Sequence, residues 1–139
     1  LSRDGRVLGI LPRFMDDLEW GHPGISELCL VDNMAQRKQQ MIDCADALVA
    51  LPGGSGTLEE LLEALTWKRL GLHSKPIVIV NTRDFFTPLA TLLEHTIEEH
   101  FMDVRHRDMW KIVEHVEEVL PAIHEMPPWD PDARRFAAL

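Results

Sequence analysis

The sequence predicts an α/β fold, a parallel sheet with helices on both of its faces. Short runs of apolar, partly β-branched residues recur along the chain, and they lack the alternation expected of a strand with one wet face. Between these runs lie amphipathic stretches whose apolar residues follow helical spacing. Fully buried strands separated by helices are typical of a parallel sheet that is covered on both sides.

The first half of the chain supplies two short strands and one helix. Residues 6–11 (RVLGIL) form an apolar run that ends at Pro12, and residues 28–31 form a second run. Residues 13–26 mix Pro, Gly, Asp and His, so we expect a loop between the two strands. Met34–Cys44 carries its apolar residues on one side and Gln, Arg and Lys elsewhere, which predicts a helix with a polar face.

The second half continues the alternation and contains the most regular helix. Leucines recur at helical spacing in residues 57–70, and Gly71 follows as a suitable C-terminal residue. Residues 76–80 (PIVIV) are wholly apolar, as in a buried strand. The remaining predicted elements are strands at 47–51 and 109–113 and helices at 86–100 and 114–124. We expect one domain over residues 1–125 and a Pro-rich tail, 126–139, that docks loosely or on a partner chain.

Composition and charge narrow the class of protein. The 139 residues are 45% hydrophobic and 27% charged, which is ordinary for a globular chain that can bury a core. The net charge of −9 argues against nucleic acid or an anionic membrane as the main partner. No apolar run approaches the roughly 18 residues of a membrane-spanning helix, and the first residues do not resemble a signal peptide. Cys29 and Cys44 are expected to be reduced, packed thiols of a cytoplasmic protein.

A glycine-rich loop follows the predicted strand at 47–51 and has the sequence Pro52-Gly53-Gly54-Ser55-Gly56-Thr57. Glycines let the backbone turn sharply and approach a ligand without a Cβ in the way. The helix that follows directs its free N–H groups and positive dipole end at the loop, which makes an anion site. The loop lacks the Gly-Lys-Ser/Thr of a Walker A motif and the GxGxxG pattern, so a monophosphate fits better than a triphosphate. The alternative is a plain tight turn.

Glu60 has two interpretations. Thr57-x-x-Glu60 matches a capping box, in which the glutamate bonds back to the backbone of the cap residue. The functional interpretation places this carboxylate beside the phosphate, where it meets a ribose. There it would stabilise an oxocarbenium-like sugar cation and position water for attack.

Arg37 and Lys38 lie on the polar face of the preceding predicted helix. Solvated surface charge is one interpretation of this pair. The other is that Arg37 reaches the glycine loop, where its planar fork would bind phosphate or carboxylate.

Two motifs together resemble the LOG ("lonely guy") family of cytokinin riboside 5′-monophosphate phosphoribohydrolases, long misnamed lysine decarboxylases. The first motif is Met34-x-x-Arg37-Lys38-x-x-Met41, and the second is Pro52-Gly53-Gly54-x-Gly56-Thr57-x-x-Glu60. The flanks are similar too: Leu65-Thr66-Trp67, Leu70-Gly71-Leu72-His73, Lys75-Pro76 and Asn81. The resemblance covers residues 5–120 and excludes the tail.

The resemblance implies a Rossmann-like fold, a homodimer, and hydrolysis of a purine nucleoside 5′-monophosphate to free base and ribose 5-phosphate. It implies that Arg37 and Glu60 are the catalytic pair. It implies that the substrate and its phosphate are bound by Met34, Lys38, Pro52, Gly53, Gly54, Ser55, Gly56 and Thr57. No metal or organic cofactor is implied. Decarboxylase chemistry would need pyridoxal phosphate on a lysine, to which no motif here points.

Members of the family carry an earlier strand–helix–strand section with its own glycine-rich turn, and we expect this chain to lack it. An alternative function is non-catalytic binding of a nucleotide or cofactor derivative on the same fold; another is a structural fragment that dimerises without a site. Glu19 and His22 are candidate contacts for the base or a partner, with free surface as the alternative. The sequence leaves the preferred base open.

Overall fold

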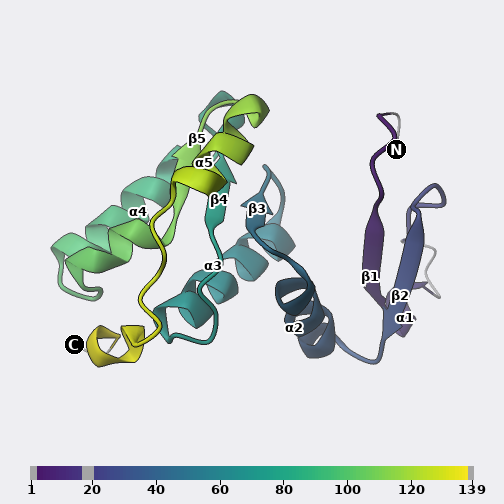
Figure 1. Ribbon diagram of the computed structural model, residues 1–139, viewed down its shortest axis with the longest axis horizontal. Coiled ribbons are helices and arrows are strands. Elements are labelled where there is room, and N and C mark those ends of the chain that lie inside the picture. The colour runs from purple at the N-terminus through teal and green to yellow at the C-terminus, as the bar shows by residue number, and fades with distance from the viewer. Residues whose placement is uncertain (1–2, 17–20, 138–139) are drawn as a thin grey trace. The chain divides into compact units, whose positions relative to one another are not determined.

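The computed structural model describes residues 3–16 and 21–137, and the chain divides into two compact units, Leu1–Ala45 and Asp46–Leu139 (Figure 1). Both contain parallel strands with helices packed on them, which confirms the predicted α/β class. One domain over residues 1–125 stays a prediction.

The first unit is a pair of parallel strands with two helices. Strand β1 (Leu8–Pro12) pairs with β2 (Glu27–Val31) along its whole length, from Leu8 opposite Glu27 to Pro12 opposite Val31. Helix α2 (Met34–Cys44) has the predicted bounds and packs on both strands. It begins after Asn33, whose side chain accepts a hydrogen bond from the Gln36 backbone N–H at 2.9 Å and so caps the helix. The short helix α1 (Arg13–Asp16) lies where a loop was expected.

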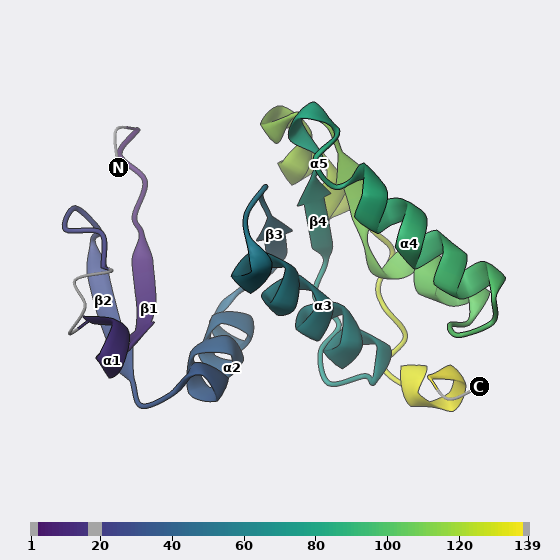
Figure 2. The same cartoon turned by 180° about the vertical axis from the view of Figure 1, so that it is seen from behind.

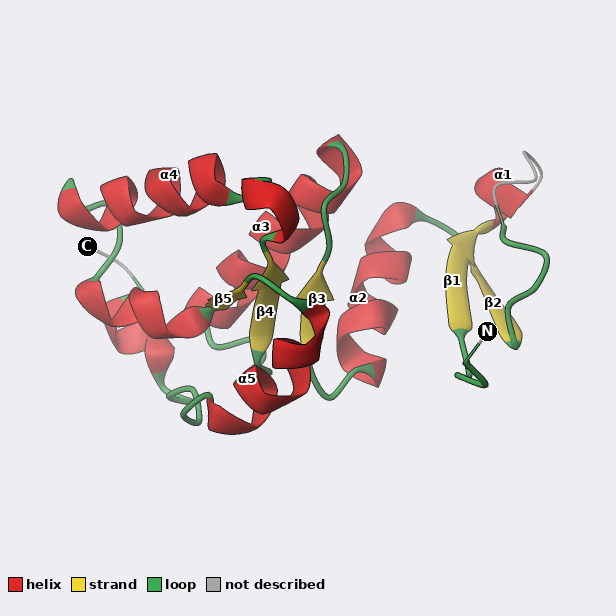
Figure 3. Ribbon diagram, turned by 90° about the horizontal axis from the view of Figure 1, so that it is seen from above, coloured by secondary structure: helices red, strands yellow, loops and turns green. Residues whose placement is uncertain are grey.

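The second unit is a three-stranded parallel sheet in the order β3–β4–β5. Its strands are β3 (Leu48–Ala50), β4 (Ile77–Val80) and β5 (Lys111–Val113), with Ala50 opposite Ile79 and Val80 opposite Val113. Helices α3 (Ser55–Arg69) and α4 (Thr87–Glu98) lie on one face, and α5 (Val119–Glu125) lies on the other (Figure 3). Helices therefore cover both faces here, as predicted.

The core of the second unit is built around β4. All four residues of β4 are buried, because the strand is central in the sheet and covered on both faces. Val78 and Val80 pack with Val113 and Ala122 on the face of α5. Side chains alternate along a strand, so Ile77 and Ile79 point to the face of α3 and α4.

The C-terminal tail is part of this core, so the expectation of a loosely docked tail, or one held by a partner, was wrong. Trp129, Ala133 and Phe136 are buried, and the Trp129 indole N–H donates to the Lys68 backbone carbonyl at 2.8 Å. The Trp129 and Phe136 rings meet edge to face with centroids 5.9 Å apart. The tail thereby holds the C-terminal end of α3.

The structure adds one element and corrects one further expectation. The segment before β5 forms a 3-10 helix, η2 (Val104–Met109), where no element was predicted. Cys29 is half-buried and Cys44 is exposed, so only the first is a packed thiol, and both are free of disulfides. Within the described part of the chain, no helix is long and apolar enough to cross a membrane.

Candidate functional site

The glycine loop leaves the C-terminal end of β3 and runs directly into α3 (Figure 2). Helix α3 begins at Ser55, and its N-cap is Gly54, which supplies no side-chain capping bond. The first helical hydrogen bond runs from the Leu58 N–H to the Gly54 carbonyl at 3.2 Å. The N–H groups of Ser55, Gly56 and Thr57 therefore have no acceptor within the helix, and they point out of its positive end. This arrangement suits an anion.

The glycines of the loop serve close approach rather than a special backbone angle. Among the described glycines only Gly71 has a positive φ, at 69°, so the expected sharp turn does not depend on the left-handed region. A Cβ added to Gly53 would overlap the Thr57 side chain, because it would lie only 2.9 Å from the Thr57 Cβ. A Cβ on Gly54 or Gly56 would meet no atom within 4 Å. Packing inside the unit thus explains Gly53, whereas Gly54 and Gly56 border open space.

The capping-box interpretation of Glu60 is wrong. Thr57 lies inside the first turn of α3, and the N-cap position belongs to Gly54. Glu60 is half-buried and follows Gly56 by four residues and Thr57 by three, so the three share one face of the helix. Helical side chains lean toward the N-terminus, which inclines the Glu60 carboxylate toward the loop.

Arg37 is held in place within the first unit. Its Nε donates to the backbone carbonyl of Ile10 in β1 at 3.0 Å, and its side chain is half-buried. The Nε end of Arg37 is therefore held against β1 rather than free in solvent, and its role at a site stays a prediction. Lys38 is also half-buried but projects about 100° further round α2. Met34 opens the same helix and is half-buried.

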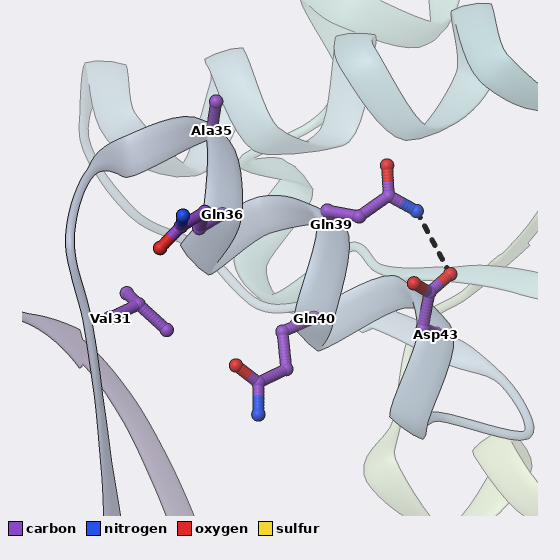
Figure 4. A pocket seen from close by; sticks show the side chains of 6 residues that line it. All are labelled: Val31, Ala35, Gln36, Gln39, Gln40 and Asp43. Carbon is purple, nitrogen blue, oxygen red and sulfur yellow. Dashed lines mark hydrogen bonds between the residues drawn. The ribbon is translucent and has the colours of Figure 1, made fainter.

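A surface hollow of about 460 Å³ lies beside α2 in the first unit (Figure 4). It is lined by Val31, Ala35, Gln36, Gln39, Gln40 and Asp43. The Gln39 side-chain amide donates to the Asp43 carboxylate at 2.9 Å. The lining contains neutral amides and a carboxylate but no cation, so this hollow is a poor site for phosphate.

A second loop, residues 81–86, lies at the same edge of the sheet as the glycine loop and was not singled out from the sequence. The Asn81 side-chain Oδ1 accepts a hydrogen bond from the Phe86 backbone N–H at 2.6 Å, and the Asn81 side-chain Nδ2 donates to the Thr87 hydroxyl at 3.1 Å. Arg83 and Asp84 have positive φ values of 56° and 60°, which is costly for residues with a Cβ. This loop could have been found from the sequence by the rule that ligands bind beyond the C-terminal ends of parallel strands.

Other candidates receive less support. The His22 ring accepts from the Gly24 backbone N–H at 3.0 Å within an exposed turn, and Glu19 lies outside the described residues. Among residues 3–16 and 21–137, no group of three or more His, Cys, Asp and Glu could hold a metal ion.

The fold and the loop define an α/β protein in which a glycine-rich loop leads into a helix N-terminus, an arrangement that suits an anion. Residues 1–123 match the protein family described as "Possible lysine decarboxylase". The chain belongs to this family, the LOG family that its two motifs resemble. The tail at 126–137 lies beyond the matched region.

Curated relatives carry a more specific name. The chain is 40% identical over 124 residues to the cytokinin riboside 5′-monophosphate phosphoribohydrolase of Rhodococcoides fascians, covering 88% of this chain and 63% of the relative. It is 44% identical over 96 residues to LOG2 of Arabidopsis thaliana, which has the same enzyme name, covering 69% of this chain and 45% of the relative. LOG7 of the same plant is 37% identical over 122 residues, covering 88% and 56%. The chain thus spans about half to under two thirds of the relatives' length.

Proposed function

We propose that the protein hydrolyses the N-glycosidic bond of a purine nucleoside 5′-monophosphate, with an adenine or a cytokinin-type base. The products would be the free base and ribose 5-phosphate. The observation that carries the proposal is the start of α3, where three unused N–H groups are followed on the same face by Glu60. The names of the relatives support this substrate class.

The loop would bind the 5′-phosphate through the N–H groups of Ser55, Gly56 and Thr57. With the phosphate fixed there, the ribose extends along the face that carries Glu60. The bond from C1′ to the base nitrogen breaks with the bonding electrons on the base, and the sugar becomes oxocarbenium-like. The Glu60 carboxylate stabilises that positive charge and orients a water molecule. The water oxygen bonds to C1′, and one proton of that water is transferred to the departing base, which leaves as the neutral free base.

Arg37 is the second catalytic residue in this proposal. Its bond to the Ile10 carbonyl fixes Nε and so directs the planar guanidinium. A guanidinium matches the geometry of phosphate and carboxylate groups, which supports a substrate-binding role. Lys38, Met34 and Pro52 complete the substrate-binding set as flanking contacts.

We further propose that the protein is a cytoplasmic homodimer. Helices α2 and α3 each expose an apolar side chain, Met41 and Leu62, at 36% and 41% of their surface. A two-fold interface would bury such positions. Free Cys29 and Cys44 support a reducing compartment.

The test is incubation of the intact protein with AMP and with N6-isopentenyl-AMP, followed by chromatography of the released base. The matching nucleosides without phosphate are the control, and they should be poor substrates. Release of the base together with ribose 5-phosphate supports the proposal. Tight binding of the nucleotides without release of base would instead identify a carrier of nucleotides or cofactor derivatives on the same fold.

A further inference from the structure

The loops after β3 and β4 are neighbours in the second unit. The two strands are parallel with Ala50 opposite Ile79, so their C-terminal ends meet at one edge of the sheet. Residues 51–54 and 81–86 both leave this edge, and they turn into α3 and α4, which lie on the same face (Figures 2 and 3). Adjacent strands are about 4.8 Å apart, so a long side chain on one loop reaches the other.

A phosphate at the start of α3 needs a cation that α3 itself does not supply. Glu59, Glu60 and Glu63 occupy the first turns of this helix. Its own cations, Lys68 and Arg69, lie in the last turn, about 20 Å from the loop at about 1.5 Å per residue. The helix N-terminus offers only a partial positive charge, worth about half an elementary charge.

The sheet topology leaves one candidate for this cation in the second unit. Lys75 and Lys111 lie at or before the starts of β4 and β5, at the opposite edge of the sheet. The other basic side chains are bound elsewhere: Arg105 to Asp103, Arg107 to Glu94, Arg134 to the Leu70 carbonyl, and Arg135 to Asp130. Among the lysines and arginines of residues 46–137, only Arg83 lies at the edge that carries the glycine loop.

The backbone around Arg83 is fixed while its side chain is exposed. Asn81 binds Phe86 and Thr87, and its carbonyl accepts from the Asp84 N–H at 3.0 Å. Arg83 makes no hydrogen bond or ion pair with any residue of the described segments. Solvated surface charge is the ordinary explanation of such a residue, but the position beside an anion site favours a binding role.

We propose that Arg83 binds the 5′-phosphate of the substrate through its guanidinium group. This inference rests on the proposed function, because it takes the glycine loop as the phosphate site. The ligand class is a phosphate monoester, which a guanidinium binds through two parallel hydrogen bonds. The phosphate does not react, so the contact is equal in ground and transition states and acts on KM rather than kcat.

Arg83→Gln tests this, because it keeps most of the side-chain length and the Cβ at positive φ but removes the charge. We expect KM for AMP to rise about 10-fold with kcat within about two-fold, since a tenfold change corresponds to about 1.4 kcal/mol. Adenosine, which has no phosphate, should be hydrolysed as in the parent. Arg83→Lys should recover part of the affinity. Lys111→Gln is the matched control, because it removes one exposed charge at the opposite edge and should change nothing.

Calorimetric binding of AMP, ribose 5-phosphate and adenosine to the same proteins separates this inference from the proposed function. Loss of affinity for the two phosphorylated ligands in Arg83→Gln, with no base released by the parent, would support the phosphate contact and refute the hydrolase. Base release with an unchanged KM in Arg83→Gln would refute the contact alone. Equal losses on AMP and adenosine would also overturn it, as would a parent protein that binds neither phosphorylated ligand.

Discussion

Lys68 is a buried ammonium group whose removal should change how stability depends on pH. Its side chain is 1% exposed, with Nζ 2.8 Å from the Met109 carbonyl and 5.6 Å from the centre of the Trp129 ring. Burial disfavours the charged form and lowers the pKa of Lys68 from 10.5 to about 8. Between these two pH values the unfolded chain binds the proton and the folded chain does not. The free energy of unfolding therefore rises with pH through this window.

The magnitude follows from the shift. Each pKa unit is worth about 1.4 kcal/mol, so the full shift corresponds to at most about 3–4 kcal/mol. Partial solvent screening reduces the expected value to about 2 kcal/mol. Lys68→Met keeps the apolar length but removes the titrating group. It also removes the donor to the Met109 carbonyl, which costs about 1–3 kcal/mol at every pH.

Urea unfolding of both proteins under reducing conditions, followed by circular dichroism from pH 7 to pH 10.5, measures the effect. The parent should gain about 2 kcal/mol relative to Lys68→Met over this range. The other alkaline groups are shared and cancel in the difference, and the chain has no tyrosine. Parallel pH profiles for the two proteins would refute the argument, because the ammonium would then not be desolvated.

Three further outcomes are expected. Measured by initial rates, Arg37→Ala should nearly abolish hydrolysis of AMP-type substrates, and Lys38→Ala should have a milder effect. An equal loss of activity on phosphorylated and unphosphorylated substrates would mean that Arg37 does not bind the phosphate. Gly53→Ala should lower the melting temperature because its Cβ overlaps Thr57, whereas Gly54→Ala should melt normally but bind AMP more weakly; identical melting would contradict the packing argument. Sedimentation of the intact protein at micromolar concentration should show a dimer, and a monomer would disprove that proposal.

Much of the fold could be predicted because local patterns agree with it. The bounds of α2 follow from its amphipathic pattern and from Asn33, and the buried β4 follows from an apolar run without alternation. The start of α3 was predicted two residues late, because Thr57 is a stronger capping signal than Gly54. In the structure the Thr57 side chain instead packs against Gly53.

Contacts between residues distant in sequence explain the remaining differences between the sequence-based predictions and the structure. Trp129 bonds to a carbonyl 61 positions earlier, and no periodicity in the tail indicates that partner. Lys68 occupies the last turn of a helix, where an exposed cation is the usual outcome, yet the tail and η2 bury it. Within the proposed site, the glycines and Glu60 were recognisable from their spacing. The role proposed for Arg83 could not be inferred from the sequence, because it depends on which strands are neighbours.

Glu60 is proposed to stabilise the sugar cation during hydrolysis. Glu60→Gln keeps the size of the side chain and removes its charge, and Glu59→Gln, at the adjacent exposed position of α3, is the matched control. The decisive measurement is the rate of base release from AMP by both variants and the parent, with melting temperatures recorded alongside. We predict that Glu60→Gln loses on the order of 100-fold or more in kcat at an unchanged melting temperature, while Glu59→Gln behaves like the parent. Near-normal turnover of Glu60→Gln with a lowered melting temperature would contradict it and assign Glu60 a structural role.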